Sequence, residues 1–483
     1  MLNIDTTETA GQKTSRWAAS APPRVVVVGT GYLGATHAAA MAALGMPTVG
    51  VDTDQEKIAR LTAGKVPFFE PELEELLQAG LSSGLLRFTT DLTDACADAD
   101  AAFVCVGTPQ ARGSNSADLR FVESAVRDLA RCAAGDLVIV GKSTVPVGTA
   151  ERLRVLIAEE AARPALDRIE LIWNPEFLRE GMAVQDTLHP DRIVIGGASA
   201  DAETLLRRIY QAPVEAGTPF LTCDLATAEL VKVSANAFLA TKISFINAIA
   251  DVCQLAGADV RALADAIGYD VRIGRQFLNA GLGFGGGCLP KDIRALMHRA
   301  AELGSSSTVA LLQSVDEINM RQRQRVIDMA LDACDGSVLN RRIAVLGAAF
   351  KPLTDDVRDS PALNVAAALH LRGAQVTVFD PQAAEAARRQ FPTLHYVASA
   401  AEAVQDSDLT LVLTEWDEFV KADPVALARD VAQPVIIDAR VCLDAVAWRR
   451  AGWTVNVLGD ATAAADRMGT AERTGTAERR SAA

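Results

Sequence analysis

Apolar residues along the first half of the chain form short continuous runs, separated by stretches with helical spacing. The run RVVVV at 24–28 leads into a glycine-rich turn, an Ala-rich stretch and a second run that ends at Val51. Further runs follow in AAFVCVG, LVIVG, IELIW and RIVIGG. β-Branched runs that alternate with helix-compatible segments are typical of a parallel sheet with helices on both faces. We therefore predict a doubly wound α/β domain over residues 22–212.

One long helix is predicted next. Residues 222–256 contain neither proline nor glycine, and Asp224 can cap their amino end. A helix of this length exceeds the ordinary globular range, so we expect it to join domains or to line a subunit contact. It belongs to a central helical region over residues 213–325.

A second alternation of strands and helices begins at RRIAVL and continues through QVTVF, LTLVL, PVIID and TVNVL. It predicts a second Rossmann-like domain over residues 326–460. The flanking segments, 1–21 and 461–483, are polar and lack core residues, and the second repeats GTAER. We expect both to be disordered.

Charge and composition exclude several functions. The chain of 483 residues has a formal net charge of −14 and a pI near 5.0, which argues against nucleic-acid binding. We find no run of about 18 apolar residues and no signal-peptide core, so no membrane association is expected. The eight cysteines contain no CxxC pair, which predicts reduced thiols in the cytoplasm, and the five histidines show no metal-site spacing.

The glycine-rich turn has the sequence GTGYLG, with Gly29, Gly31 and Gly34 between a predicted strand and a predicted helix. In that context the glycines let a pyrophosphate approach a helix N-terminus. Asp52 ends the second strand, where a carboxylate can accept hydrogen bonds from a ribose diol and would repel a 2′-phosphate. The pattern favours NAD over NADP, the alternative being a glycine turn that binds no nucleotide.

Lys232 and Asn236 lie four residues apart on the predicted long helix and therefore share one face. They could hold a reacting oxygen, or Lys232 could be a solvated residue on the outer face. Spacing alone leaves both interpretations open.

Cys288 stands in the segment GLGFGGGCLPKD, where five glycines precede it and Lys291 and Asp292 follow. By itself it could be a small buried residue beside a turn. A thiol becomes useful, however, when an alcohol is oxidised beyond the aldehyde. Thiolate attack then gives a thiohemiacetal, a second hydride loss gives a thioester, and water releases a carboxylate.

These motifs together identify a family resemblance. The chain resembles the nucleotide-sugar 6-dehydrogenases, the UDP-glucose/GDP-mannose dehydrogenase family, over about residues 24–460. The resemblance rests on GTGYLG, CVGTP, STVPVGT, NPEFLREG, DRIVIGG, ELVKVSANAFLATKISFIN, RIGRQFLNAGLGFGGGCLPKD, GAAFKPLTDDVRDSPA and FDP, in that order. It implies two Rossmann-like domains joined by a long central helix within a helical dimerisation region. The implied reaction converts UDP-glucose, two NAD and water to UDP-glucuronate, in a homodimer or a higher homo-oligomer.

The resemblance also implies catalytic roles. Cys288 matches the nucleophile, Lys232 and Asn236 match the pair that stabilises the oxyanion, and Asp292 matches a carboxylate that supports Lys232 and a water. Thr144 matches a residue that positions this water, and Glu176 matches the acid–base group of thioester hydrolysis.

The implied ligand contacts fall into two sets. The cofactor set comprises Gly29, Gly31, Tyr32, Leu33, Gly34, Asp52, Lys57, Thr108, Thr144, Glu180, Lys291 and Arg358. The substrate set comprises Glu176, Phe177, Leu178, Arg179, Glu180, Lys232, Asn236, Arg272, Phe277, Leu278, Asn279, Ala280, Gly281, Gly285 and Lys351. Within it, Arg272 matches an arginine that the family often lends across the dimer. No metal ligand is expected.

Departures from the family pattern leave alternatives open. Val233 and Ala248 replace residues frequent in bacterial members, at positions without a catalytic role, and Leu289 also occurs in enzymes that act on GDP-mannose. GDP-mannose therefore stays an alternative substrate. A two-electron dehydrogenase of the 6-phosphogluconate type would leave Cys288 unexplained. A catalytically silent nucleotide-sugar sensor would be expected to have lost at least one catalytic residue.

Overall fold

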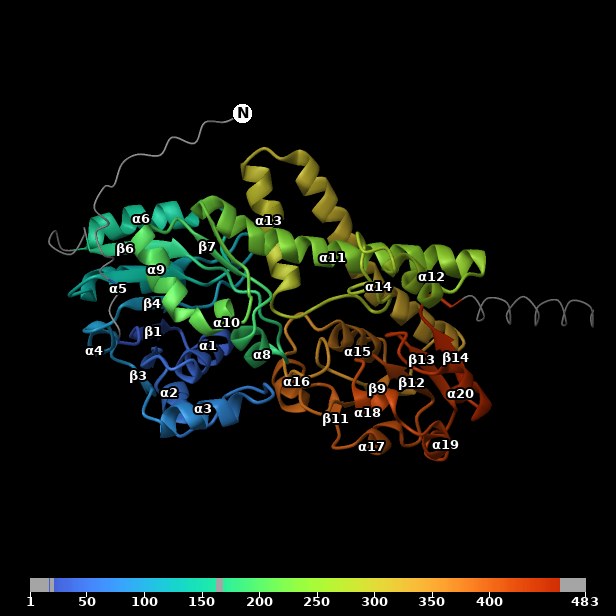
Figure 1. Cartoon of the computed structure of the whole chain (residues 1–483). Coiled ribbons are helices and arrows are strands. Elements are labelled where there is room, and N and C mark those ends of the chain that lie inside the picture. The colour runs from blue at the N-terminus through green and yellow to red at the C-terminus, as the bar shows by residue number, and fades with distance from the viewer. Residues whose placement is uncertain (1–16, 18–20, 162–167, 461–483) are drawn as a thin grey trace, which may run out of the picture. The chain divides into compact units, whose positions relative to one another are not determined.

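The computed structural model describes residues 17, 21–161 and 168–460 (Figure 1). It divides into two compact units, the first formed by Met1–Pro109 with Ala117–Lys232 and the second by Gln110–Ser116 with Val233–Ala483. The division falls inside the long helix, directly after Lys232. The predicted disordered tail and nearly all of the predicted disordered arm lie outside the described residues.

The first unit contains an eight-stranded sheet in the order β3-β2-β1-β4-β5-β6-β7-β8. Its strands are β1 (Val25–Val28), β2 (Thr48–Val51), β3 (Leu86–Thr89), β4 (Ala101–Val104), β5 (Leu137–Gly141), β6 (Ile169–Trp173), β7 (Ile193–Gly196) and β8 (Phe220–Cys223). The order of the first six is that of a Rossmann fold, as predicted. Two features were not predicted: the edge strands β3 and β8, and the antiparallel pairing of β6 with β7 at Trp173 and Gly196.

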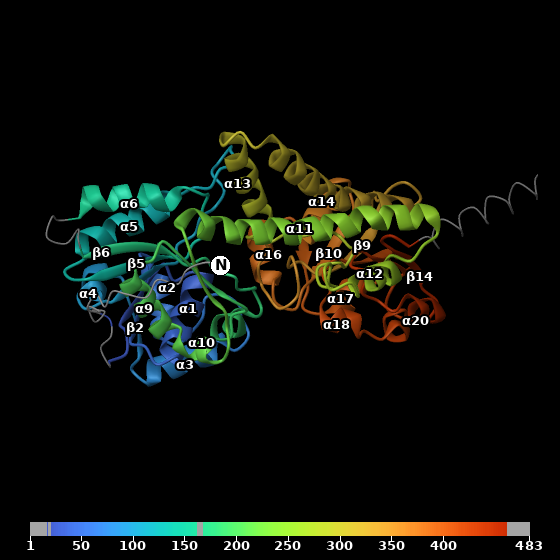
Figure 2. The same cartoon turned by 45° about the horizontal axis from the view of Figure 1, so that its top comes forward.

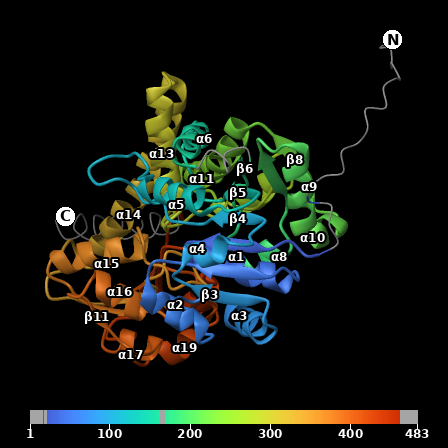
Figure 3. The same cartoon turned by 90° about the vertical axis from the view of Figure 1, so that its left-hand side faces the viewer.

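Helices cover both faces of this sheet (Figure 3). Alternate strand residues face two separate cores: Val25 and Val27 of β1 pack with α1, α3 and α9, whereas Val26 and Val28 pack with α4, α5 and α6. The helices are α1 (Tyr32–Ala43), α2 (Gln55–Thr62), α3 (Leu73–Ser82), α4 (Leu92–Cys96), α5 (Arg120–Cys132), α6 (Thr149–Glu160), α8 (Ala183–Leu188), α9 (Ala200–Ile209) and α10 (Gln211–Glu215).

Helix α11 (Leu225–Ala256) is the predicted long helix. Asp224 caps it, because its carboxylate accepts hydrogen bonds from the Thr227 amide and hydroxyl. By length and composition α11 could cross a membrane, with a mean hydropathy of 1.3 in its most apolar window, a property that the sequence analysis missed. A core helix meets the same criterion, and 44% of that window is buried, including Ala240, Ile246 and Ala250.

Three further helices, α12 (Val260–Gly268), α13 (Leu289–Glu302) and α14 (Ser306–Ala333), follow in the second unit. Figure 2 shows α13 and α14 as the two arms of a hairpin. Between α12 and α13 runs the glycine-rich segment that contains Cys288, so this segment enters the amino end of α13.

The second unit also contains a six-stranded sheet in the order β11-β10-β9-β12-β13-β14, with every pair parallel. Its strands are β9 (Arg342–Leu346), β10 (Gln375–Phe379), β11 (His395–Tyr396), β12 (Leu409–Val412), β13 (Val435–Asp438) and β14 (Thr454–Val457). Its helices are α15 (Pro361–Leu371), α16 (Ala384–Gln390), α17 (Ala400–Val404), α18 (Asp417–Val420), α19 (Pro424–Leu427) and α20 (Ala445–Arg450). This is again the Rossmann order, and it confirms the prediction of a second Rossmann-like domain.

Candidate active site

The turn after β1 is shaped for close contact. Gly29 has φ +88°, and a Cβ added at Gly34 would lie 1.7 Å from the Gly29 carbonyl oxygen, so neither position accepts a side chain. A Cβ at Gly31 would meet nothing within 4 Å. Among the described residues no side chain caps α1, which begins here. Its first amide groups are therefore available to an anion.

Asp52 follows β2 at the neighbouring position of the sheet edge. Its carboxylate accepts hydrogen bonds from the Thr30 amide (2.8 Å) and from Lys57 Nζ (2.8 Å). Burial raises the pKa of the Asp52 carboxyl, but the hydrogen bonds from Lys57, Asp54 and Thr30 together lower it more, so the group is ionised at neutral pH. Lys57 and Asp52, both predicted cofactor contacts, are thus paired with each other.

Tyr32 joins the glycine turn to the loop after β6. Its hydroxyl donates to Glu70, and it accepts a hydrogen bond from the Gly181 amide at 2.9 Å. Glu70 also accepts from the Gly181 and Ala183 amides, both at 2.6 Å. Glu180 is buried beside this bridge. The predicted contacts Tyr32 and Glu180 therefore lie in one connected region, whereas Leu33 packs against the core.

The carboxyl ends of β4 and β5 bring Thr108 and Thr144 together. The Thr108 hydroxyl donates to the Thr144 carbonyl at 2.8 Å. Just beyond, Glu229 of α11 accepts hydrogen bonds at 2.7 Å from the amides of Gly148 and Ala150, at the start of α6. These bonds fix the STVPVGT segment to the amino end of α11, although burial outweighs them and raises the pKa of the Glu229 carboxyl.

Lys142 and Glu176 form a buried ion pair at the ends of β5 and β6. Lys142 Nζ lies 2.8 Å from Glu176 Oε2, and the two side chains are 5% and 14% exposed. The other carboxylate oxygen, Oε1, accepts hydrogen bonds from the amides of Phe177 (2.7 Å) and Leu178 (3.0 Å). The sequence analysis selected Glu176 but missed Lys142.

Lys232 lies over the ring of Phe177, 5.6 Å from its centroid, and Arg192 stacks on the same ring at 3.9 Å. The charge of Lys232 also lowers the pKa of Glu176, after the larger effects of burial and of Lys142. Lys232, Glu176 and Phe177 therefore share one region, and all three are among the predicted site residues. Arg179, by contrast, is held by two hydrogen bonds to Asp186.

In the second unit, Cys288 occupies the N-cap position of α13 and is exposed. The positive end of the helix dipole favours a negative charge there, and hence a thiolate. The other seven cysteines are less accessible, four of them fully buried. The predicted nucleophile is the exposed cysteine among the eight.

Asp292 lies one helical turn after Cys288 and is buried. Its carboxylate accepts a hydrogen bond from Asn236 Nδ2 at 2.7 Å and forms an ion pair with Lys291 at 2.5 Å. Its amide donates to the Cys288 carbonyl at 3.0 Å. The structure thus connects Asp292 with three other predicted residues. The implied support of Lys232 by Asp292 stays a prediction.

Two buried asparagines fix the glycine-rich segment. Asn319 of α14 donates to the Phe284 carbonyl and accepts from the Phe284 amide, at 3.0 and 2.8 Å. Asn247 of α11 accepts from the Gly281 amide at 2.8 Å. A Cβ at Gly283 would lie 2.3 Å from Asn319, so the small residue is needed for this approach. Sequence reasoning missed both asparagines.

The segment also lies against the loop after β9. A Cβ at Gly285 would be 2.4 Å from the Asp359 carbonyl, and one at Gly287 would be 2.2 Å from the Arg358 guanidinium. Arg358, a predicted cofactor contact, is held by Asp356. Lys351, a predicted substrate contact, is partly exposed beside Phe350.

Arg440 is a basic residue that sequence reasoning missed. It follows β13, is partly buried, and donates to the carbonyls of Leu413, Gly283 and Phe350 at 2.7, 3.0 and 3.1 Å. The only signal in the sequence was its place just after a predicted strand of the second sheet.

The remaining predicted substrate residues vary in exposure. Leu278, Ala280 and Gly281 are buried, and Phe277 has φ +64°. Asn279 is exposed and bonded to Arg275. Arg272 is 86% exposed and paired with Asp270.

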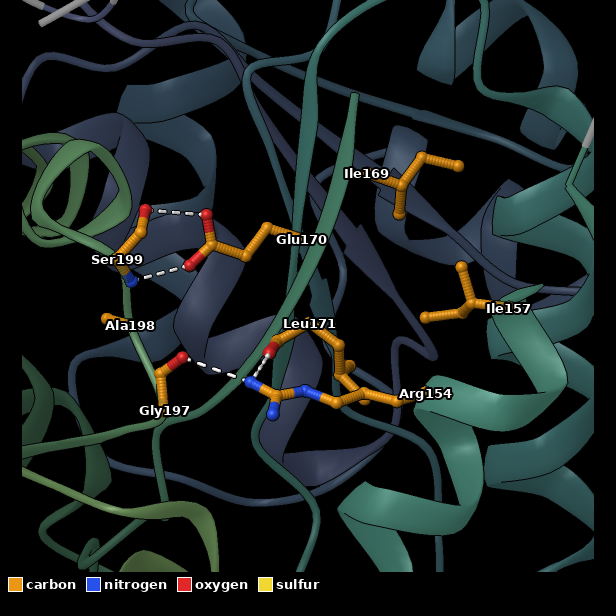
Figure 4. A pocket seen from close by; sticks show the side chains of 8 residues that line it. All are labelled: Arg154, Ile157, Ile169, Glu170, Leu171, Gly197, Ala198 and Ser199. Carbon is orange, nitrogen blue, oxygen red and sulfur yellow. Dashed lines mark hydrogen bonds between the residues drawn. The ribbon is translucent and has the colours of Figure 1, made fainter. Parts of the chain in front are cut away.

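A surface pocket of about 480 Å³ opens at the amino end of β6, the opposite end from Glu176 (Figure 4). Its polar side chains are bonded within its own wall: Arg154 to the Leu171 and Gly197 carbonyls, and Glu170 to the amide and hydroxyl of Ser199. It contains none of the predicted site residues. In the described residues, no group of three His, Cys, Asp or Glu side chains could hold a metal ion.

Comparison with known proteins agrees with this geometry. Residues 23–214 match the NAD binding domain of the UDP-glucose/GDP-mannose dehydrogenase family, residues 226–321 its central domain and residues 344–445 its UDP binding domain. The chain belongs to this family. The glycine turn, the uncapped α1 terminus and ionised Asp52 fit the NAD that binds in its first domain.

Relatives in the family align over most of their length. The UDP-glucose 6-dehydrogenase of Rhizobium meliloti is 41% identical over 86% of this chain and 95% of its own. That of Bacillus subtilis is 40% identical over 90% and 93%, respectively. A solved UDP-glucose dehydrogenase from Pyrobaculum islandicum superposes with a TM-score of 0.83 at 37% identity, over 90% of this chain and 99% of the other.

Proposed function

We propose that this protein catalyses the NAD-dependent oxidation of the C6 hydroxyl of UDP-glucose to the carboxylate of UDP-glucuronate, removing four electrons. The observation that carries the proposal is the exposed Cys288 at the amino end of α13, one turn from the Asp292–Asn236 pair. A single alcohol oxidation would not need this thiol. The relatives at 40 and 41% identity, both named UDP-glucose 6-dehydrogenases, support the choice of substrate.

The glycine turn and Asp52 would hold NAD, which would supply the hydride acceptor for each of the two oxidations, and the hydroxyl proton lost in each oxidation is released to solvent. Lys232 and Asn236, one helical turn apart on α11, hold the reacting oxygen as its charge changes. The Cys288 thiolate adds to the aldehyde carbon to give a thiohemiacetal, and loss of the second hydride gives a thioester.

Hydrolysis of the thioester needs a water and a proton acceptor. The water oxygen bonds to the thioester carbon, its proton passes to Glu176, and the carbon–sulfur bond breaks to return the Cys288 thiolate. Thr144 positions this water. The product is the sugar carboxylic acid, which releases the second water proton to solvent to become the carboxylate, and Glu176 later returns its own proton to solvent.

Binding of the sugar nucleotide is assigned to the loops around these groups. Phe177–Glu180, Phe277–Gly281, Gly285 and Lys351 form the proposed substrate contacts, and Lys291 and Arg358 supplement the cofactor contacts. Lys351 supplies a cation from the UDP binding domain, which suits a diphosphate.

The working form is a homodimer. Phe238, Phe245 and Val252 recur every seven residues on α11 and are 65%, 49% and 57% exposed. Such a stripe of large apolar side chains is typical of a helix that packs against another. Arg272 of one protomer reaches across this interface to the site of its partner. The protein works in the cytoplasm, where the Cys288 thiol stays reduced.

Counting NADH tests the proposal. UDP-glucose should give two NADH for each molecule consumed, and GDP-mannose should give none. One NADH for each UDP-glucose would identify a two-electron dehydrogenase instead. No NADH with either sugar nucleotide, under conditions where both ligands bind, would indicate a silent binding protein. Two NADH for each GDP-mannose, with none from UDP-glucose, would identify GDP-mannose as the substrate.

A further inference from the structure

The surroundings of Glu176 are more constrained than its role as a proton acceptor requires. Lys142 Nζ donates to Glu176 Oε2 at 2.8 Å and to Asn174 Oδ1 at 3.2 Å, and the Tyr210 hydroxyl donates to the same Asn174 oxygen at 2.7 Å. Asn174 in turn donates to the Val194 carbonyl at 2.9 Å. The ammonium is therefore anchored at the meeting point of β5, β6 and β7.

The hydrogen bonds leave Glu176 one acceptor position. A carboxylate has about four lone-pair sites. The Phe177 and Leu178 amides occupy those of Oε1, and Lys142 occupies one on Oε2. Among the described residues nothing is bonded at the second site of Oε2. A proton taken by Glu176 would be received there, in a direction fixed by three hydrogen bonds.

Titratable groups around Glu176 lie on or directly after five other elements. Lys142 follows β5, Cys105 follows β4, Tyr210 follows α9, and His37 lies on α1, beside the Lys142 ammonium. Lys232 of α11 adds a second cation. Burial raises the pKa of both Cys105 and Tyr210 to about 12, and burial with the Lys142 charge keeps His37 neutral by lowering its pKa. Between pH 6 and 9 these three neighbours therefore do not change charge.

Lys142 itself stays charged. Burial alone would lower the pKa of this ammonium, but Glu176 and Tyr210 raise it more, so the net shift is upward. Burial likewise raises the pKa of Glu176, yet the charge and hydrogen bond of Lys142 bring it below its ordinary value. Without Lys142, only the Phe177 amide and the more weakly acting charge of Lys232 would oppose the effect of burial, so we expect the pKa of Glu176 to rise.

We propose that Lys142 is a positioning residue for hydrolysis, which holds Glu176 as an ionised carboxylate with one Oε2 lone pair directed at the attacking water. This inference rests on the proposed thioester mechanism. The step it controls is the transfer of one water proton to Glu176, as the water oxygen bonds to the thioester carbon and the Cys288 thiolate departs. Neither hydride transfer requires this carboxylate to be ionised.

Lys142→Gln tests the inference, because its amide can still donate hydrogen bonds but carries no charge. Thioester hydrolysis is followed by rapid quenching and mass spectrometry, beside the NADH burst, from pH 5.5 to 9. We expect hydrolysis to be at least about tenfold slower than wild type at pH 6 and to recover towards pH 9, since about one pKa unit changes the ionised fraction tenfold. The NADH burst should keep its amplitude, and acyl-enzyme should accumulate at low pH.

Lys142→Arg and Glu176→Gln are the matched variants. Lys142→Arg keeps the charge and should keep the wild-type pH profile. Glu176→Gln should hydrolyse slowly at every pH. An equal loss at all pH values for Lys142→Gln would show a merely structural role and overturn the inference. If Lys142→Gln does not fold, wild type decides: its hydrolysis should persist below pH 4.5, and an acid limb above about pH 5 would contradict the inference.

Failure of the proposed function and failure of the role proposed for Lys142 would give different results. If wild type forms no acyl-enzyme with UDP-glucose, the proposed function fails before Lys142 is tested. If wild type gives two NADH and a thioester, but the pH profile of Lys142→Gln is unshifted, only the role of Lys142 is wrong.

Discussion

At the scale of single residues, substitution of Cys288 tests whether the oxidation removes four electrons through a thioester. Cys288→Ser keeps the size of the side chain but replaces a thiolate with a hydroxyl that is scarcely ionised near neutral pH. We expect the variant to bind both ligands, to stall near the first hydride or as an oxygen ester, and to lose turnover by several orders of magnitude. Mass spectrometry with UDP-glucose and NAD, read beside the NADH yield, checks this.

A buried cysteine provides the control for this substitution. Cys334 packs into the core of the second sheet, so Cys334→Ser should lower the free energy of unfolding by about 1 kcal/mol and leave the rate unchanged. Full turnover by Cys288→Ser, with two NADH and no adduct, would rule out the thioester mechanism.

We expect Asp52 to determine which dinucleotide is accepted. Asp52→Arg replaces an acceptor for ribose hydroxyls with a cation that can pair with a 2′-phosphate, so the preference for NAD over NADP should fall at least about tenfold. Absolute NAD affinity should fall as well, because the new cation would lie beside Lys57, which Asp52 now neutralises. Binding of both dinucleotides is measured by titration.

The neighbouring carboxylate is the matched control for Asp52. Asp54 caps α2 by accepting from the Lys57 amide, so Asp54→Asn should leave the ratio of NAD to NADP affinity where it is. An unchanged ratio in Asp52→Arg as well would remove Asp52 from the ribose site.

At the scale of elements, the two sheets use the same position differently. Asp380 follows β10, as Asp52 follows β2, but it is buried and accepts hydrogen bonds from the amides of Ala348, Ala349, Gln382 and Ala383 and from the indole of Trp416. Its acceptor sites are filled by the protein. The acidic residue after the second strand is therefore a candidate ribose ligand in the first sheet and a structural residue in the second.

The glycine-rich segment depends on Asn319. Asn319→Ala removes two hydrogen bonds and leaves the buried amide and carbonyl of Phe284 unpaired, which should cost about 1–3 kcal/mol of unfolding free energy for each group. Because Cys288 lies four residues further on, we also expect kcat to fall by about 100-fold, the typical effect of a 1 Å displacement. Chemical denaturation and steady-state kinetics measure the two effects.

Another position on α14 provides the comparison. Gln313 is exposed, so Gln313→Ala should change neither stability nor rate. A loss of stability in Asn319→Ala without any loss of kcat would mean that the segment keeps its geometry without the asparagine.

Much of this arrangement could be predicted from the pattern of residues, and the exceptions have physical reasons. The buried β-branched runs and the long helix were correct because they bury continuous apolar surface. The edge strand β8 was missed because Leu221 and Thr222 are exposed, and β11 because it has only two residues. The antiparallel pairing of β6 with β7 was missed because an apolar run carries no information about direction.

The same reasoning explains which site residues were found. Glycines and the proposed catalytic side chains fall in recognisable motifs, whereas Lys142, Asn319 and Arg440 have partners that are distant in the sequence. Lys142 is 34 residues from Glu176, and the two meet because β5 and β6 are parallel neighbours. Only the order of strands reveals such a pair.

At the scale of the whole molecule, the apolar stripe on α11 predicts the assembly. Phe245 is 49% exposed at the middle of the three stripe residues, and a carboxylate there would be desolvated in a helix–helix interface at a high cost. We expect wild type to be a dimer and Phe245→Glu a monomer at micromolar concentrations, measured by light scattering after gel filtration. Thermal unfolding checks that the variant remains folded.

We expect activity to depend on dimer formation, because Arg272 is proposed to contact the substrate bound by the partner protomer. Phe245→Glu should lose affinity for UDP-glucose in proportion to its dissociation, and Arg272→Ala should lose affinity while remaining dimeric. Phe121→Glu is the matched control: Phe121 is 52% exposed, but it belongs to α5 and not to the stripe on α11. Both its assembly and its activity should be those of wild type. A fully active monomer of Phe245→Glu would show that one chain supplies every residue that the reaction needs.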